Sequence, residues 1–372
     1  MSKRLYIIAG EASGDLHGAN LIKALFNEEK DLTIRAWGGE RMQNAGAQLT
    51  KHYRDLAFMG FVEVLMNLKT ILGNLRFCKE DIVEFKPDAL ILIDYPGFNM
   101  RIASWAHDKG IKVLYYISPQ IWAWKKNRVF KLKKTVDHMF VILPFEKEFY
   151  KNYEMDVEFV GHPLLDEIQE FKNNARALVD FRSNNNLSDK PIIAVVPGSR
   201  KQEISKILPE MLKVGSSFPD HQFVIAAAPS IDDDYYEGFI EGSDTSIIRD
   251  QTYSLYHHAI AGMVASGTAT LEAALFDLPE VVCYKGSAIS IAIARRVIKV
   301  KYISLVNLIM DQEMVKELIQ NDLNKSNLES QLNLLLDPSY RDKLMEGYTN
   351  LQQKLGGIGA SSHAAKSMLK SL

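Results

Sequence analysis

The 372-residue sequence predicts an α/β protein with two domains, each built on a parallel β-sheet. Short, wholly apolar runs such as Leu5–Ala9 and Ala89–Ile93 are each followed by a polar turn and a helical segment. Such runs are typical of central parallel strands, which are buried on both faces. The same pattern starts again at Pro191–Val196, after a polar helical segment at 164–189 that we interpret as a linker. The length also favours two domains.

Composition and charge indicate a globular protein that is not built to grip nucleic acid. Hydrophobic residues make up 47% of the chain, charged residues make up 24%, and the formal net charge is −2. Cys78 and Cys283 fit no metal-binding or redox spacing, so we expect a reducing compartment. The apolar run near the N-terminus is too short for a signal peptide. No run of about 18 apolar residues predicts a membrane-spanning helix.

Each remaining element of the first domain, residues 1–163, follows from the same alternation of apolar runs and turns. The glycines and serine after the first strand open a helix at Asp15–Phe26, and Pro144 ends a strand and opens a helix at Phe145–Tyr153. The other expected strands are Leu32–Ala36, Lys112–Ile117 and His138–Leu143.

The second domain, residues 164–345, repeats the pattern. A turn at Pro197–Arg200 leads into a helix that reaches Ser216, and a short helix is expected at Tyr253–His258. The chain from Glu313 onward is expected to be helical, and the helices of residues 346–372 are expected to pack back on the first domain. The other expected strands are Gln222–Ala227, Ser246–Ile248, Ala261–Val264 and Glu280–Cys283.

The turn Ser266-Gly267-Thr268, between a buried strand and a helix that reaches Phe276, predicts an anion site. A helix start leaves backbone N–H groups free and carries a partial positive charge, which suits a phosphate group. Glu272 lies one turn into the helix, where a carboxylate can accept hydrogen bonds from two sugar hydroxyls. The alternative is an ordinary Ser/Thr-capped helix with a surface Glu.

Two turns of the first domain also lie where ligands of open α/β sheets bind, at the carboxyl ends of strands. One is the Gly-rich loop Gly10–Asp15, which does not match the dinucleotide-binding glycine pattern. The other contains Asp94, which is either catalytic or a turn-forming residue. His162, in the turn that leaves this domain, contacts a substrate or is a structural turn histidine.

The segment Leu56–Phe77 carries more apolar surface than a helix on a sheet requires. The surplus is either a second core contact or a patch for lipid. Basic residues at Lys125–Lys134 indicate a solvated helix or a rim that attracts phosphates, and those at Ile289–Lys301 indicate a lipid-facing or an ordinary helix. The side chains expected to face a membrane are Met59, Val62, Met66 and Lys69.

Together these features fit a nucleotide-diphosphate sugar bound by the second domain and an acceptor bound by the first. Arg200, in a turn at a strand end, can pair with a diphosphate through two parallel hydrogen bonds. No Asp-x-Asp pattern follows an expected strand. We therefore expect Arg200 and the helix dipole, with no metal or other cofactor, to meet the charge of the leaving group.

Six motifs in this order resemble the lipid-A-disaccharide synthase family, from Leu5 to about Leu318. The resemblance implies a GT-B glycosyltransferase with two Rossmann-like domains facing across a cleft. It implies that UDP-2,3-diacylglucosamine and 2,3-diacylglucosamine 1-phosphate condense to a β-1′,6-linked disaccharide with release of UDP. The motifs are Gly10–Asp15, Met59–Leu65, Ser118–Trp124, Leu143–Glu146, Pro197–Arg200 and Ala265–Glu272.

The resemblance also assigns the site residues. Asp94 is the expected general base, which takes the proton of the acceptor 6-hydroxyl. Gly97 departs from the family, because many relatives have a second Asp there. The expected nucleotide-binding residues are Arg200, Ser266, Gly267, Thr268, Glu272 and Asn307. The expected acceptor-binding residues are Glu11, Ser13, Gly14, Asp15, Gln120, Trp122, Lys125, Arg128 and His162.

Two other classes use similar features, and the resemblance adds a location. A UDP-sugar 2-epimerase has the same two-domain frame but needs no apolar helix flanked by basic residues. A non-catalytic carrier of sugar nucleotides or lipids needs no Asp at the crevice. The family resemblance implies a peripheral enzyme of Gram-negative lipopolysaccharide synthesis, on the cytoplasmic face of the anionic inner membrane. Whether the protein forms a homodimer is left open at this point.

Overall fold

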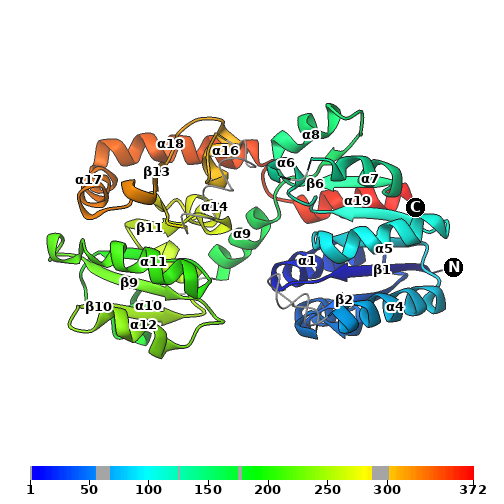
Figure 1. Ribbon diagram of the computed structural model, residues 1–372, viewed down its shortest axis with the longest axis horizontal. Helices are drawn as coiled ribbons and strands as arrows, with labels where there is room; N and C mark the ends of the chain where they lie inside the picture. Colours follow the sequence, from blue (N-terminus) through cyan, green and yellow to red (C-terminus); the bar gives the residue numbers. More distant parts are fainter. Residues whose placement is uncertain (1, 56–67, 125, 175–177, 287–300) are drawn as a thin grey trace. The chain divides into compact units, whose positions relative to one another are not determined.

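The computed structural model describes residues 2–55, 68–124, 126–174, 178–286 and 301–372 (Figure 1). Contacts divide the chain into two compact units. Unit 1 comprises Met1–Asp166 and Leu355–Leu372, and unit 2 comprises Glu167–Lys354. The chain therefore passes from unit 1 to unit 2 and returns to unit 1 for its last helix. The sequence had placed the divisions after residues 163 and 345.

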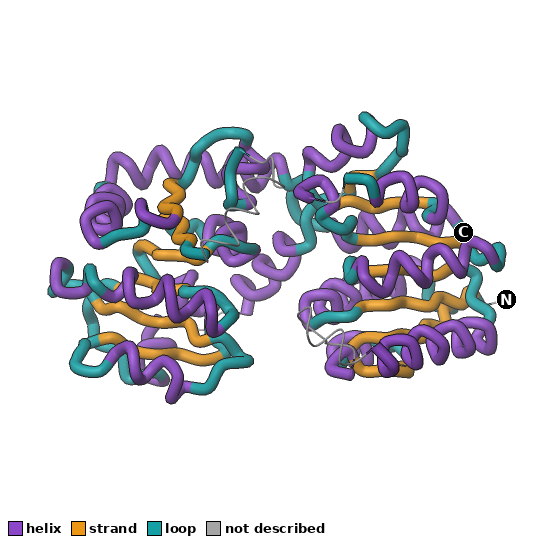
Figure 2. The backbone as a smooth tube through the Cα atoms, in the orientation of Figure 1, coloured by secondary structure: helices purple, strands orange, loops and turns teal. Residues whose placement is uncertain are grey.

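Unit 1 is built on a seven-stranded parallel sheet in the order β3-β2-β1-β4-β5-β6-β7 (Figure 2). The central strands consist of apolar residues because helices cover them, and β4 is buried at every position. Every residue of Leu5–Ala9 is 0% exposed. The strands are β1 (Lys3–Ala9), β2 (Leu32–Gly38), β3 (Gln48–His52), β4 (Ala89–Ile93), β5 (Lys112–Tyr116), β6 (His138–Val141) and β7 (Glu158–Phe159).

The helices of unit 1 begin at residues suited to helix starts. Pro144 is the first residue of α8, and the carboxylate of Glu146 accepts a hydrogen bond from the Leu143 N–H at 3.0 Å. The helices are α1 (Ala12–Glu28), α2 (Glu40–Asn44), η1 (Tyr53–Asp55), α4 (Leu68–Phe85), α5 (Pro96–Asp108), α6 (Ile121–Trp124), α7 (Arg128–Thr135), α8 (Pro144–Lys151) and α19 (Ala360–Ser371).

The last helix, α19, is fastened into unit 1. It packs along α1, and its buried face includes Ala360, Ala364, Ala365 and Met368. The carboxylate of Asp166 accepts hydrogen bonds from the backbone N–H groups of Gly359 and Ser361, at 2.5 and 3.1 Å. Asp166 therefore caps the N-terminus of α19 from a distant part of the sequence.

Unit 2 is built on a six-stranded parallel sheet in the order β10-β9-β8-β11-β12-β13. Helix α9 (Leu164–Asn174) begins in unit 1 and continues into unit 2. The strands are β8 (Ile192–Val196), β9 (Gln222–Ala227), β10 (Thr245–Arg249), β11 (Ala261–Ala265), β12 (Glu280–Tyr284) and β13 (Lys316–Ile319). The helices are α10 (Leu178–Asn184), α11 (Lys201–Leu212), η2 (Gly215–Ser217), α12 (Asp233–Ile240), α13 (Thr252–His258), α14 (Thr268–Leu275), α16 (Leu305–Met310), η3 (Gln320–Asp322), α17 (Lys325–Leu336) and α18 (Pro338–Lys354).

The predicted fold class, two parallel-sheet α/β domains, is confirmed, but three strands at sheet edges were missed. These are β3, β7 and β13, and the prediction that the chain is helical from Glu313 onward is wrong at β13. Edge strands are half-covered and short, so charged and polar residues interrupt their apolar pattern. β13 reads Lys-Glu-Leu-Ile and has only one buried position.

Helix α4 exposes large apolar side chains on one side and buries others on the opposite side. Leu75 is 8% exposed and belongs to the core, but Leu72 is 59% exposed. Val83 is 53% exposed, and with Lys69 and Arg76 these residues share one side of the helix at spacings of three, four and seven. None of the described helices is long and apolar enough to cross a membrane.

Glu280, at the start of β12, is a buried acid without a partner. It is 1% exposed, and neither carboxyl oxygen has a hydrogen-bond partner among the described residues. Burial raises its pKa well above the usual value. Between the unfolded and folded pKa values the folded state binds more protons, so stability falls as pH rises through that window.

Glu280→Gln should therefore raise the unfolding temperature near neutral pH and change it little at about pH 3, where Glu280 is protonated in both states. Each unit by which the folded pKa exceeds the unfolded one corresponds to about 1.4 kcal/mol. Thermal unfolding followed by circular dichroism across this pH range measures the effect. A difference between the two proteins that is the same at every pH would contradict it.

Candidate active site

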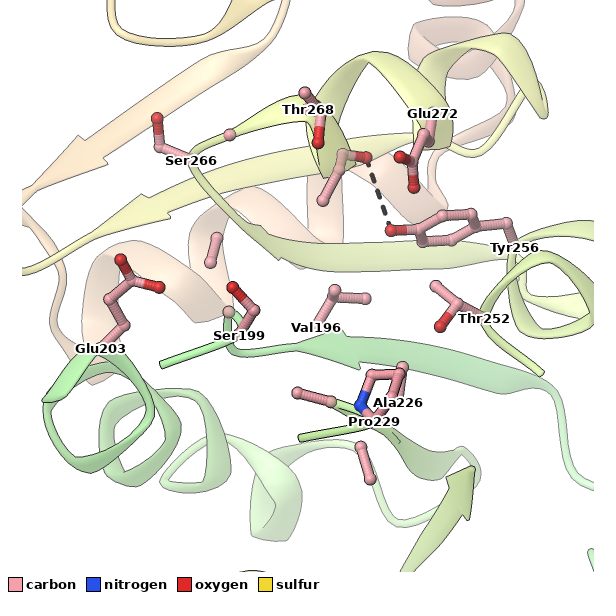
Figure 3. Close-up of a pocket in the computed structure, with 16 residues that line it drawn as sticks. Val196, Ser199, Glu203, Ala226, Pro229, Thr252, Tyr256, Ser266, Thr268 and Glu272 are labelled. Carbon is pink, nitrogen blue, oxygen red and sulfur yellow. Dashed lines mark hydrogen bonds between the residues drawn. The ribbon is translucent and has the colours of Figure 1, made fainter. Parts of the chain in front are cut away.

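Unit 2 contains a cavity of about 220 Å³ at the carboxyl ends of β8, β9 and β11 (Figure 3). In Figure 3, Glu272, Tyr256 and Thr252 lie toward one end, and Ser199, Glu203 and Ser266 lie toward the other. Small residues at the end of β9 and directly after it, Ala226–Pro229, form part of the wall. This is the edge at which parallel sheets bind ligands.

The turn after β8 requires glycine. Gly198 has a φ of +105°, and a Cβ there would lie 2.9 Å from Oε2 of Glu203. Glu203 lines the cavity and pairs with Arg200, whose Nη1 lies 3.3 Å from Oε1 of Glu203. The Arg200 side chain is 72% exposed and is not part of the cavity wall as the structure describes it. Arg200 is therefore next to the predicted site rather than in it.

The turn after β11 places Ser266 differently from the expectation. Its N–H donates to the carbonyl of Cys283 at 3.0 Å, and its hydroxyl donates to the carbonyl of Ile303 at 3.0 Å. Both donors of Ser266 are thus occupied by backbone, so it shapes the turn and has no free donor for a phosphate. The first N–H groups of α14, at Thr268 and Ala269, have no partner within the helix and line the cavity with the positive end of the dipole.

Glu272 lies at the cavity end opposite the turn after β8. Burial and, to a smaller extent, the nearby Glu167 carboxylate raise its pKa to about 7. The hydroxyl of Tyr256 donates to the carbonyl of Ala269 at 3.5 Å (Figure 3). Tyr256 and Thr252 were not predicted, because neither belongs to a recognisable motif.

Asn307 does not reach the cavity. It is 0% exposed, and its side-chain amide donates to the carbonyl of Val315 at 2.8 Å and to Glu317 at 2.9 Å. Its side-chain oxygen accepts from the N–H groups of Met314 and Val315, at 2.8 and 3.0 Å. We expected Asn307 to contact the nucleotide directly. The structure corrects this expectation, because every polar atom of the Asn307 side chain is already bonded within the protein.

In unit 1 the turn after β4 holds Asp94 in an unusual conformation. Asp94 and Tyr95 have φ values of 42° and 46°, in the left-handed region that costs about 1–3 kcal/mol per residue. The Tyr115 hydroxyl donates to the Asp94 carbonyl at 2.6 Å, and the side-chain amide of Asn99 donates to it at 2.9 Å. These bonds fix the backbone at Asp94 and do not use its carboxyl group.

The Asp94 carboxyl group has a raised pKa. Burial raises it to about 7, and the Glu11 carboxylate contributes in the same direction. Glu11 follows β1 and Asp94 follows β4, and these strands pair up to Ala9 and Ile93. Burial raises the pKa of Glu146 to about 7 as well. A carboxyl group that ionises near neutral pH is suited to general-base catalysis.

Gly10 allows Tyr95 to occupy its position. A Cβ at Gly10 would lie 2.3 Å from the Tyr95 ring, so any other residue would displace that ring. Gly14 packs similarly on Ala9, where a Cβ would lie 3.1 Å from the alanine side chain. The Gly-rich loop thus supports the Asp94 turn through packing.

Two expected acceptor-binding residues have structural roles. Asp15 is 3% exposed, and its carboxylate accepts from the N–H groups of Gly39 at 2.6 Å and Met42 at 3.1 Å, at the start of α2. His162 is 5% exposed, and burial lowers its pKa to about 3. Its Nδ1 accepts from the Leu164 N–H at 3.3 Å. Both side chains therefore accept hydrogen bonds from backbone N–H groups within the fold.

The remaining residues expected to bind the acceptor or to face a membrane are exposed, partly buried or outside the described residues. Ser13 and Gln120 are exposed, and Trp122 packs edge-on against Phe145 at 4.9 Å between ring centroids. Arg128 is partly buried at the start of α7. Lys69 is exposed on α4. The predictions for Met59, Val62, Met66 and Lys125 lie outside the described residues.

Two Rossmann-like units, each built on a parallel sheet with its own helices, define the GT-B class of fold. The solved structures that the fold resembles support this class. UDP-GlcNAc 2-epimerase from Neisseria meningitidis, bound to UDP-GlcNAc, superposes with a TM-score of 0.72 at 14% identity, over 99% of this chain and 100% of that one. The glycosyltransferase of kitacinnamycin gives a TM-score of 0.66 at 13% identity, over 99% of each chain.

The sequence comparison identifies the family. Residues 5–368 match the family model for lipid-A-disaccharide synthetase. The chain is 40% identical to the lipid-A-disaccharide synthase of Syntrophus aciditrophicus and 38% identical to that of Trichlorobacter lovleyi, over 98% of this chain and 96% of each relative. The chain belongs to the lipid-A-disaccharide synthase family.

Gly10→Ala should lower transferase activity about a hundredfold, because the added methyl group displaces Tyr95 and with it the Asp94 carboxylate. Gly97→Ala is the matched control, since a Cβ there meets nothing within 4 Å and Gly97 lies in the first turn of α5. Steady-state rates of both variants at the same protein concentration make the comparison. Equal activities would show that Tyr95 does not transmit the change to Asp94.

Proposed function

We propose that this protein transfers the diacylglucosamine group of UDP-2,3-diacylglucosamine to the 6-hydroxyl of 2,3-diacylglucosamine 1-phosphate and releases UDP. The observation that carries this proposal is the turn after β4, which presents a carboxyl group with a pKa of about 7 at the ligand-binding end of the sheet. Membership of the lipid-A-disaccharide synthase family supports the same reaction.

The reaction is a single displacement with inversion. Asp94 accepts the proton of the acceptor hydroxyl as its oxygen bonds to the anomeric carbon. The bond between that carbon and the diphosphate oxygen breaks, and the electron pair leaves with UDP. A hydroxyl is a poor nucleophile, so removal of its proton by a positioned base supports the step.

Unit 2 binds the UDP part of the donor. The free N–H groups at Thr268 and Ala269 face the diphosphate, and Glu272 accepts hydrogen bonds from the ribose. Arg200 can leave its exposed ion pair with Glu203 and bind the diphosphate instead, because exposed ion pairs contribute only about 0–1 kcal/mol. We propose that these groups, without a metal, stabilise the charge that develops on the leaving group.

An epimerase is the weaker alternative. The epimerases resemble this chain in fold at 12–14% identity, which shows the architecture alone. The relatives named lipid-A-disaccharide synthase are 35–40% identical over nearly the whole chain. A strict requirement for the lipid acceptor in UDP release separates the two activities.

Asp94→Asn should lower the transfer rate by about 10²–10⁴-fold and leave UDP affinity unchanged. In the unmodified protein, kcat/KM should fall as pH drops below about 7, because the protonated carboxyl cannot accept the hydroxyl proton. Glu11→Gln should move this inflection to lower pH, since it removes a charge that raises the Asp94 pKa. Near-normal turnover by folded Asp94→Asn would rule out Asp94 as the base.

We further propose that the exposed side of α4 docks on the anionic cytoplasmic face of the inner membrane, where acylated substrates reside. Leu72 and Val83 are exposed on this side, flanked by Lys69 and Arg76. Each immersed apolar side chain contributes roughly 1.5–3 kcal/mol, and each basic residue near the surface contributes about 1 kcal/mol. Such contributions give reversible, peripheral binding.

Leu72→Ser combined with Val83→Ser should weaken binding to vesicles that contain anionic lipid and leave the unfolding temperature almost unchanged. Leu75→Ser, on the buried side of the same helix, should lower the unfolding temperature instead, because Leu75 is 8% exposed. Vesicle co-sedimentation and thermal unfolding provide the two measurements. Unchanged sedimentation of the double variant would exclude α4 as the docking surface.

A further inference from the structure

Glu317, on the edge strand β13, forms hydrogen bonds with the segment that leads into α16. Its carboxylate accepts from the Ile303 N–H at 3.0 Å, and from the Ser304 N–H and hydroxyl at 2.9 and 2.8 Å. It also accepts from the side-chain amide of Asn307 at 2.9 Å. Hydrogen bonds to a carboxylate are stronger than those between neutral groups, so this cluster holds residues 303–307 firmly.

Asn307 fastens the same segment to the chain that leads into β13. Its amide donates to the Val315 carbonyl, and its side-chain oxygen accepts from Met314 and Val315. Asn307 is 0% exposed and all its hydrogen-bonding groups are used. Buried polar clusters that are fully satisfied define one arrangement of the backbone, because any shift leaves a buried group unpaired.

The peptide held by this cluster in turn holds the nucleotide-binding turn. The N–H of Ile303 bonds to Glu317, and its carbonyl accepts the Ser266 hydroxyl at 3.0 Å. Ser266 lines the cavity directly before the start of α14. A chain of contacts thus runs from Glu317 through Ile303 to Ser266, at the point where free N–H groups are presented.

We propose that Glu317 and Asn307 are positioning residues for nucleotide binding, which they support by fixing the Ile303 carbonyl against Ser266 and so the geometry of the Ser266–Thr268 turn. This inference rests on the proposed function, because it assigns UDP to this cavity. The same contacts also cap α16, whose Ser304 hydroxyl accepts from the Asn307 N–H at 3.3 Å. A role confined to capping would change stability but not affinity for UDP.

Glu317→Gln tests the inference with little change in shape. Glutamine retains one acceptor oxygen but directs an NH₂ group toward N–H donors, so the cluster cannot keep all its bonds. We expect UDP to bind about tenfold more weakly to the full-length variant by isothermal titration calorimetry. The apparent KM for the donor should rise while that for the acceptor stays unchanged.

Glu313→Gln is the matched control. Glu313 lies three residues before Lys316 and forms an exposed pair with it at 2.8 Å, outside the cluster. This variant should bind UDP as the unmodified protein does. Equal weakening by Glu313→Gln and Glu317→Gln would overturn the proposal, because the effect would then reflect charge alone.

A double-mutant cycle with Ser266→Ala locates the path. If Glu317 acts through Ile303 and Ser266, the double variant should lose little more UDP affinity than the more affected single variant. Additive losses would overturn the proposed path. Ser304→Ala provides a second test if Glu317→Gln does not fold. This variant removes one donor to Glu317 at a residue outside the cavity wall, and it should weaken UDP binding about threefold.

The outcomes separate this inference from the proposed function. Unchanged UDP affinity in folded Glu317→Gln or Ser304→Ala, beside normal binding by the unmodified chain, would overturn the positioning role alone. Failure of the unmodified chain to bind UDP would overturn the assignment of the cavity and, with it, this inference.

Discussion

The candidate active site of unit 1 depends on one strained turn. Asp94 and Tyr95 both have left-handed backbone angles, which L-residues adopt only when their surroundings impose them. The Tyr115 hydroxyl and the Asn99 amide hold the Asp94 carbonyl, and Tyr95 occupies the space left by the missing side chain of Gly10. The buried sheet therefore supplies the rigidity, because Tyr115 lies in β5, Gly10 directly follows β1 and Asp94 directly follows β4.

The sequence predicted the interior of both sheets well and their edges poorly. Interior strands such as β4 and β9 have the predicted bounds, because burial on both faces requires unbroken apolar residues. β13 looked helical because its charged residues hide a strand with one buried position. One of those residues, Glu317, is charged for a reason that no local pattern shows. Its partners lie in the segment 303–307, which a different part of the sequence supplies.

The candidate site shows the same limit at the level of single residues. Residue type and position near a strand end brought out Asp94, Thr268 and Glu272. The structure places Asp94 directly after β4, Thr268 at the start of α14 and Glu272 one turn into α14. The same criteria also selected Ser266 and Asp15, whose hydrogen-bonding groups are taken by backbone. A sequence shows which groups can bind a ligand, but the count of donors and acceptors already satisfied by the fold requires coordinates.

Under the proposed function, unit 2 binds a diphosphate through hydrogen-bond donors that the fold leaves unused. Ser266 has no free donor, and Asn307 is enclosed. The backbone N–H groups at the start of α14 therefore act beside the exposed Arg200 and the hydroxyl-bearing residues of the cavity wall. Backbone donors cannot be altered by changing their own side chains; their direction depends on the path of the turn. Under the proposed assignment of UDP to this cavity, the residues that fix the turn from behind therefore influence nucleotide binding as well. The buried cluster around Glu317 fixes the turn from behind, because it binds the Ile303 backbone and the Ile303 carbonyl accepts a hydrogen bond from Ser266.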